Sequence, residues 1–302
     1  MSVPHFDLHN HTAFSYDAYG RPGDLFAEAA RKGVAVVGIT EHNNFGSLSE
    51  ATSAAKDFPS VKYVWGIELT VETPWGSVDT LHYFPRTDGP AVAALLELHR
   101  ARYEQMDHWR AEALQALGHA YDVAELRRRY VATYPNRTDK GFGVSNQVMR
   151  AILLADGVIA SLEDWPAMAR RMAEAVPKMP VYPDVSASMA AMDEMSGVRV
   201  LAHAGQYVKL DDERADWFID TLGLHGLEID HEANSEADRA FLEAVASRRG
   251  LLVTGGGDCH EIVEKPETFG VYGGTAEQFE AFMAVARRVS PGARGFPDLL
   301  KP

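Results

Sequence analysis

Residues 34–39 read Val-Ala-Val-Val-Gly-Ile, a short apolar run without a polar side chain. A strand with this pattern has both faces buried, as strands do in parallel sheets that are covered by helices. Helical patterns flank the run at 22–32 and at about 47–56. This alternation predicts an α/β fold built on a parallel sheet or barrel.

The same alternation covers both ends of the chain. Further strands are predicted from short apolar runs, which lie at 3–8, 61–69, 80–84, 198–202, 227–229 and 251–254. About seven strands in βα units favour a TIM-like barrel over a doubly wound sheet.

The middle of the chain has a different character. Residues 90–118 contain strong helix formers with no internal Gly or Pro, several shorter helical segments follow, and no strand-like run is found. We therefore predict a barrel formed by 1–87 and 196–302, with an all-helical insertion, acting as a cap, at 88–195.

Charge and cysteine content restrict the partners of the chain. The 302 residues carry 29 Lys and Arg against 43 Asp and Glu, a formal charge of −14. This balance argues against an extended nucleic-acid surface or a membrane surface, because both are bound by clustered cations. The single cysteine, Cys259, excludes intramolecular disulfides and cysteine-based zinc fingers. We find no targeting segment and no apolar run of about 18 residues, so the expected location is the cytoplasm.

Histidine and acidic residues recur at the ends of the predicted strands. Elsewhere in the chain, histidines such as His99 and His108 show no such relation to the strands. The residues at strand ends are His9, His11, Glu41, His42, Glu68, His82, His203, Glu228, His231, Asp258 and His260.

In parallel α/β barrels the carboxyl ends of the strands converge on one cavity. Imidazole and carboxylate groups are the usual ligands of Zn, Mn and Fe. Two histidines at i and i+2 on an extended segment, such as His9 and His11, can chelate one ion, and Glu68 could bridge two ions. Any one of these residues alone is more often structural. Their shared position predicts a site for two or three divalent ions.

Eight short motifs contain the candidate ligands. They are Asp7-Leu-His9-Asn-His11-Thr, Ser15-Tyr-Asp17, Thr40-Glu-His42-Asn, Gly66-Ile-Glu68, Leu81-His82, Ala202-His203-Ala, Gly226-Leu-Glu228 and Gly257-Asp258-Cys-His260. In their order and number these motifs resemble those of the polymerase and histidinol phosphatase (PHP) superfamily. The resemblance covers both predicted barrel segments, and the insertion resembles that of a branch containing small-nucleotide phosphoesterases and an exoribonuclease.

The resemblance implies a distorted (β/α)7 barrel, three metal positions holding Mn, Zn or Fe, and phosphoester hydrolysis. The ligand sets it implies for the three ions are His9, His11, Glu68 and Asp258; Asp17, His42 and His260; and Glu68, His82 and His203. The chain departs from the family pattern in Thr40-Glu-His-Asn43, where the family has Thr-Asp-His-Asp. It also has Gly143-Val-Ser-Asn146 where the nucleotide branch often has Arg-Pro-His.

These features predict hydrolysis of a phosphomonoester on a small phosphorylated metabolite or nucleotide, by a hydroxide that bridges two ions. His231 is a candidate for protonating the leaving oxygen, with helix capping or the orientation of a ligand as the alternative. Arg137 and Lys140 are candidates for contacting the substrate, although either one alone is more often a solvated loop charge. Histidinol phosphate is an alternative substrate. The sequence predicts neither the preference between mono- and diesters nor the oligomeric state.

Two other classes of function are less favoured. An amidohydrolase-type C–N or C–O hydrolase commonly uses a bridging carboxylated lysine, but no lysine ends a predicted strand and Glu68 occupies the bridging place. A non-catalytic metal-binding scaffold should have lost ligands, yet none of the nine expected ligands is missing.

Overall fold

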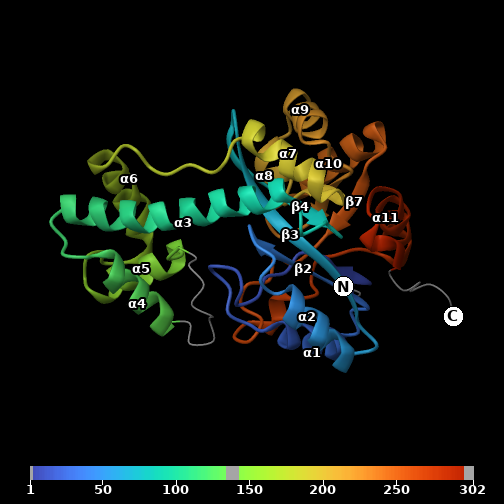
Figure 1. Ribbon diagram of the computed structural model, residues 1–302, viewed down its shortest axis with the longest axis horizontal. Helices are drawn as coiled ribbons and strands as arrows, with labels where there is room; N and C mark the ends of the chain where they lie inside the picture. The colour runs from blue at the N-terminus through green and yellow to red at the C-terminus, as the bar shows by residue number, and fades with distance from the viewer. Residues whose placement is uncertain (1–2, 134–142, 296–302) are drawn as a thin grey trace. The chain divides into compact units, whose positions relative to one another are not determined.

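The computed structural model describes residues 3–133 and 143–295 of the chain (Figure 1). It divides into two compact units, one formed by Met1–Leu96 and Pro183–Pro302 and the other by Glu97–Tyr182. Residues 88–96 and 183–195, which the sequence pattern grouped with the insertion, therefore belong to the first unit.

Seven strands form one sheet in the first unit, and their order in the sheet follows their order in the chain. The Leu8 amide donates to the Gly255 carbonyl over 3.2 Å, which brings the last strand beside the first in a nearly closed barrel. The strands are β1 (Phe6–Asp7), β2 (Val36–His42), β3 (Lys62–Thr73), β4 (Gly76–Tyr83), β5 (Val198–Leu201), β6 (Gly226–Asp230) and β7 (Leu252–Gly255).

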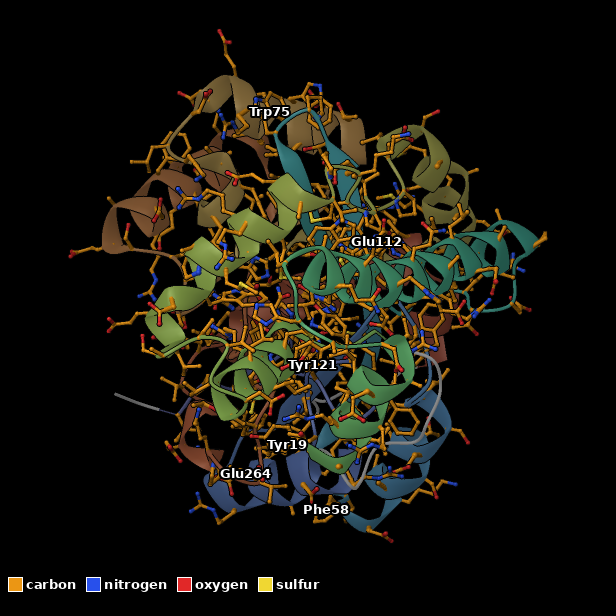
Figure 2. The ribbon with its side chains drawn as sticks, turned by 90° about the vertical axis from the view of Figure 1, so that its left-hand side faces the viewer. Tyr19, Phe58, Trp75, Glu112, Tyr121 and Glu264 are labelled. Carbon is orange, nitrogen blue, oxygen red and sulfur yellow. The ribbon has the colours of Figure 1, made fainter. Side chains whose placement is uncertain are left out.

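Strand β4 runs antiparallel to both of its neighbours, β3 and β5, so the expectation of a uniformly parallel sheet was wrong here. Both strands of the β3–β4 pair extend further than predicted and leave only Pro74 and Trp75 between them. A connection this short can join only antiparallel strands. Gly76, with a φ of 101°, supplies the left-handed backbone at the turn. Trp75 projects from the turn (Figure 2) and packs edge-on against Trp217, with 4.8 Å between ring centroids.

Side chains alternate between the two faces of this sheet. On β4, Leu81 and Tyr83 pack on the inner face with Phe6 and Val200, together with part of the last helix. Val78, which points to the opposite face of β4, joins an outer core against the surrounding helices. The helices of this unit are α1 (Pro22–Lys32), α2 (Leu48–Ala54), α7 (Val185–Met195), α8 (Gly205–Val208), α9 (Asp212–Leu222), α10 (Glu236–Arg249) and α11 (Ala276–Val289).

The described residues of the second unit form helices joined by turns and loops, with no strand among them. It contains most of α3 (Pro90–Ala116), and then α4 (Val123–Thr133), α5 (Asn146–Ala155) and α6 (Trp165–Ala175). The buried Asp107 carboxylate accepts hydrogen bonds from the Val144 amide and from Arg127, both over 2.7 Å, and so joins α3 to the segments that follow it. Among the described residues, no helix combines the length and apolar character that crossing a membrane requires.

Candidate metal centre

The first group of potential ligands gathers around the segment that follows β1. The Nε2 atoms of His9 and His11 lie 3.2 Å apart. Asp258 Oδ1, from the loop after β7, is 3.4 Å from His9 Nε2 and 3.0 Å from His11 Nε2. Glu68 on β3 approaches the same two nitrogens within 3.4 and 3.3 Å. Four side chains that are far apart in the chain therefore direct their donor atoms to one point.

A second group lies next to the first. The Nε2 atoms of His42, at the end of β2, and His260 are 3.2 Å apart. Asp17 Oδ1 is 3.3 Å from His42 and 3.4 Å from His260. The His11 ring stacks on both imidazoles, with centroid distances of 4.1 and 4.3 Å, so the two groups are contiguous.

A third group is formed by Glu68, Asp79 and His203, which each offer a donor atom within 4.8 Å of the others. His203 Nε2 is 3.3 Å from Glu68 Oε1. The hydroxyl of Tyr207 donates to Asp79 Oδ2 over 2.6 Å. Glu68 thus faces both the first and the third groups, as a bridging carboxylate would.

His82, which the sequence analysis placed in this third group, lies elsewhere, and this expectation requires correction. His82 pairs with Ile67 and Arg199, and like Ile67 it lies on the outer face of the sheet, opposite to Leu81. Its Nε2 lies 3.1 Å from the Thr80 hydroxyl. Burial, followed by the charge of Arg199, lowers its pKa to about 3. Asp79, three residues earlier and on the inner face, occupies the expected place.

The electrostatics of the cluster suit a group of cations. Burial alone would raise the pKa of Asp17, but His42 and His260 hold it well below its usual range. The pKa of Glu68 is lowered in the same way, against the effect of burial, by the neighbouring His9 and His42. The pKa of His260 is raised to about 9, since Asp17 and Asp258 outweigh its burial.

Several donor atoms have no hydrogen-bond partner despite being buried. These atoms are Asp17 Oδ1, Glu68 Oε2 and Asp258 Oδ1. Orphaned carboxylate oxygens are costly inside a protein unless a cation compensates them. Together with the converging imidazoles, they form a donor set that fits Mn, Zn or Fe.

The backbone of two potential ligands is strained. His203 and Asp258 have φ values of 31° and 50°, in a region of backbone conformation that residues other than glycine rarely adopt. Asp258 is held there by a hydrogen bond of 2.8 Å from its amide to the His9 carbonyl. This approach requires Gly256, since a Cβ at that position would lie 2.4 Å from the Cβ of His9.

The orientation of His11 is set by Ser15, whose hydroxyl uses all of its hydrogen-bonding sites. The Ser15 hydroxyl donates to Glu41 Oε2 over 2.5 Å and accepts the His42 amide over 3.0 Å. Its remaining lone pair faces His11 Nδ1 at 3.1 Å. Because a hydroxyl has only one proton to donate, His11 must carry its proton on Nδ1, which leaves Nε2 free as a ligand.

Glu228 orients His9 in a similar way. Both of its carboxylate oxygens lie 3.1 Å from His9 Nδ1, and one of them accepts the His203 amide over 2.7 Å. Although Glu228 could form a metal group with His9 and His231, it faces the nitrogen of His9 that points away from the first group. We therefore assign it to positioning His9, leaving Nε2 free as the ligand.

His231 is 4% exposed and approaches the same cluster. Its Nδ1 accepts the Ala233 amide over 3.0 Å, so the neutral ring carries its proton on Nε2. That Nε2 has no hydrogen-bond partner and lies 3.8 Å from Asp258 Oδ2. The geometry therefore presents a proton donor at the edge of the metal centre.

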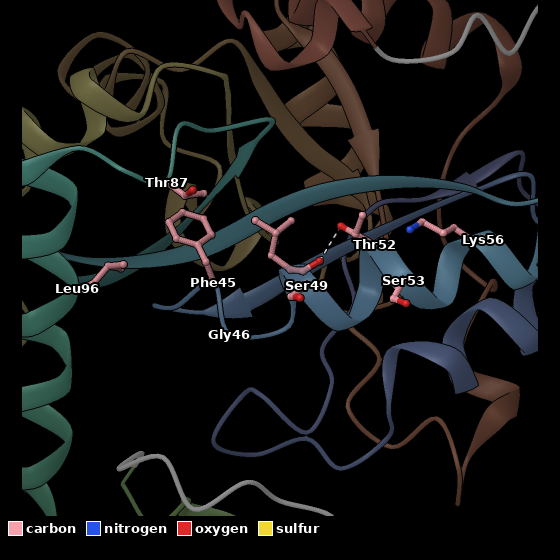
Figure 3. A pocket seen from close by; sticks show the side chains of 9 residues that line it. Phe45, Gly46, Ser49, Thr52, Ser53, Lys56, Thr87 and Leu96 are labelled. Carbon is pink, nitrogen blue, oxygen red and sulfur yellow. Dashed lines mark hydrogen bonds between the residues drawn. The ribbon is translucent and has the colours of Figure 1, made fainter.

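The remaining sequence predictions concern substrate contacts. Arg137 and Lys140 lie outside the described residues. A separate groove of about 820 Å³ runs along α2 and is lined by residues that include Phe45, Ser49 and Lys56 (Figure 3). None of the residues that line it belongs to the three groups.

Sequence reasoning missed Asp79, which the structure brings to the centre. Glu41 was noted only as a residue at a strand end and Ser15 only as part of a motif, and neither was given a role of its own. Asp79 could have been found from alternation alone, because it and Leu81 must share a face of the same strand.

Comparison with known proteins places this geometry in context. The PHP domain family model matches residues 7–155. A 3',5'-nucleoside bisphosphate phosphatase of Chromobacterium violaceum is 25% identical, over 85% of this chain and 88% of its own length. A phosphoribosyl 1,2-cyclic phosphate 1,2-diphosphodiesterase of Eggerthella lenta is 27% identical, over 84% of this chain and 93% of its own length.

Among solved structures, a protein of Bifidobacterium adolescentis provisionally described as a metal-dependent phosphoesterase superposes with a TM-score of 0.75. It is 26% identical to this chain, and the superposition covers 92% of this chain and 95% of that protein. The likeness extends over both of the units into which the chain divides.

Proposed function

Because the chain carries a PHP domain and is a metal-dependent phosphoesterase of that family, we propose that it hydrolyses a phosphomonoester of a small phosphorylated metabolite or nucleotide. The observation that carries this proposal is the convergence of imidazole and carboxylate donors on Glu68. Both relatives are named for small phosphorylated compounds, which supports the same class of substrate here.

Three ion positions follow from the three groups. The ligands that we propose are His9, His11, Glu68 and Asp258 for the first, Asp17, His42 and His260 for the second, and Glu68, Asp79 and His203 for the third. Bound divalent ions would lower the pKa of a water molecule and neutralise charge on the phosphate.

The protein's own groups complete the site. His231 presents its Nε2 proton toward the cluster, and we propose that it donates this proton to the leaving oxygen. A phosphate contact by Arg137 and Lys140, a capping role for the helical insertion and a cytoplasmic location remain predictions.

The test is phosphate release from a panel of sugar phosphates, nucleotides, bisphosphonucleotides, histidinol phosphate and a cyclic phosphodiester, with Mn²⁺ added. We expect release from at least one monoester, and its loss in His9→Ala, because that variant lacks a donor of the first group. His231→Asn should lower kcat while leaving metal content unchanged. If no substrate is hydrolysed faster by the native protein than by His9→Ala, the proposal fails.

A further inference from the structure

We propose that the Glu68–Asp79–His203 group is a hard-cation position that takes Mn²⁺ or Mg²⁺ while the nitrogen-richer groups hold Zn²⁺ or Fe²⁺, so that the centre is of mixed metal content. This inference rests on the proposed function. It assigns different ions to different groups of ligands.

The donor types differ between the groups. The group around His42 offers two imidazole nitrogens and one carboxylate, and the group around His9 also offers two imidazoles. The third group offers two carboxylates and only one imidazole. Nitrogen donors favour Zn and Fe, whereas oxygen donors suit Mg and Mn. The third group is therefore the one that binds Zn²⁺ least strongly relative to Mn²⁺.

Asp79 is the residue that decides this difference. Tyr207 donates to Asp79 Oδ2 over 2.6 Å and so holds this carboxylate in place, with an oxygen within 4.8 Å of the donor atoms of Glu68 and His203. The nearby imidazole of His82 cannot replace it, because β4 directs His82 to the outer face, where it pairs with Arg199. The oxygen-rich character is therefore built into the register of the β3–β4 pair.

The exchange Asp79→His gives the sharpest test, since it turns the third group into one with two imidazoles. The native protein is first saturated with Zn²⁺ and then dialysed against excess Mn²⁺ without added Zn²⁺. Metal content is measured by inductively coupled plasma mass spectrometry, and bound Mn²⁺ by electron paramagnetic resonance. We expect about one equivalent of Mn²⁺ beside the retained Zn²⁺. In Asp79→His, Zn²⁺ should replace most of this Mn²⁺.

Two further variants keep the test decisive. Asp79→Asn keeps the shape of the side chain but removes its charge, and should lose the Mn²⁺ equivalent without gaining Zn²⁺. His82→Gln is the matched control on the same strand, and should keep the native ratio of the two metals. Circular dichroism verifies that each variant is folded. If Zn²⁺ fills every position of the native protein in excess Mn²⁺, or if Asp79→His leaves the ratio unchanged, the inference is overturned.

The test of metal content and the test of phosphoester hydrolysis can fail independently of each other. A protein that binds both metals but releases no phosphate from any substrate would contradict only the function. A protein that hydrolyses phosphomonoesters with the same metal at all of its positions would contradict only the inference about Asp79.

Discussion

The Ser15 hydroxyl has every hydrogen-bonding site occupied, by Glu41, by the His42 amide and by His11 Nδ1. A small side chain without charge thus fixes which nitrogen of His11 is available. Groups that orient metal-binding histidines in this way typically contribute a factor of about 10–100 to metal affinity.

We therefore expect Ser15→Ala to weaken metal binding by about 10- to 100-fold, because His11 loses the acceptor that holds its proton on Nδ1. Competition with a chromophoric chelator measures the affinity. Nitrogen-15 NMR of the metal-free protein should show a change in the tautomer of a histidine.

The matched control for Ser15→Ala is Thr12→Val. Thr12 also donates to Glu41, over 2.5 Å, but the Ser15 contact with His11 does not depend on it. An equal loss of affinity in both variants would indicate general damage to the loop, and would contradict a specific role for Ser15.

At this scale, the sequence pattern singled out most of the residues that the structure brings together, but it included His82 and omitted Asp79. His9 and His11 are recognisable because their spacing and position after a strand are both informative. His82 follows the same strand, but the alternation of side chains places it on the face opposite to Leu81 and Asp79. Ser15 and Glu41 act through hydrogen bonds across the fold, which no local pattern encodes.

At the scale of elements, the register of β4 with β3 and β5 directs His82 away from the face that carries the three groups of potential ligands. The pKa of His82 falls to about 3 in the folded chain, through burial and then the charges of Arg199 and His225. An unfolded histidine has a pKa near 6.5, so between these values the unfolded state binds the additional proton. Neutral His82 therefore contributes stability above pH 6.5 that is lost as the pH falls toward 3.

This difference predicts that the free energy of unfolding falls by about 2 kcal/mol between pH 7 and pH 5 on account of His82 alone. Urea unfolding at the two pH values measures the change. His82→Gln cannot titrate and should show a smaller fall, although other groups continue to contribute. An identical fall in both proteins would contradict the burial of a neutral imidazole at this position.

The strands themselves were largely predictable, since apolar runs such as 34–39 indicate β2. The hairpin formed by β3 and β4 was not predictable, because residues 70–73, which extend β3, include polar side chains and did not resemble a buried strand. Pairing with β4 satisfies their backbone groups, and such long-range pairing overrides local preference.

At the scale of the whole molecule, the chain has a net charge of −14, and part of that excess lies in the metal centre. Asp17, Glu68 and Asp258 each have a buried oxygen without a hydrogen-bond partner. A cation bound only by the folded protein stabilises it by mass action.

Removal of metal should therefore lower the Tm. At a concentration one hundred times the Kd, one bound ion contributes about 2.7 kcal/mol, which corresponds to about 4 °C for a chain of this size. Differential scanning calorimetry of chelated and Mn²⁺-reloaded protein measures the shift. Equal Tm values for the two samples would contradict a metal centre in the folded barrel.

The ring of strands has a further consequence for how the protein is made. His9 and His11 leave the ribosome early, whereas Asp258 and His260 belong to the loop after β7. During synthesis, His9 and His11 therefore lack these partners until the residues of the second unit, Glu97–Tyr182, and then the final strand have been translated. A product of premature termination would lack both late residues, and so could not assemble the centre on which hydrolysis depends.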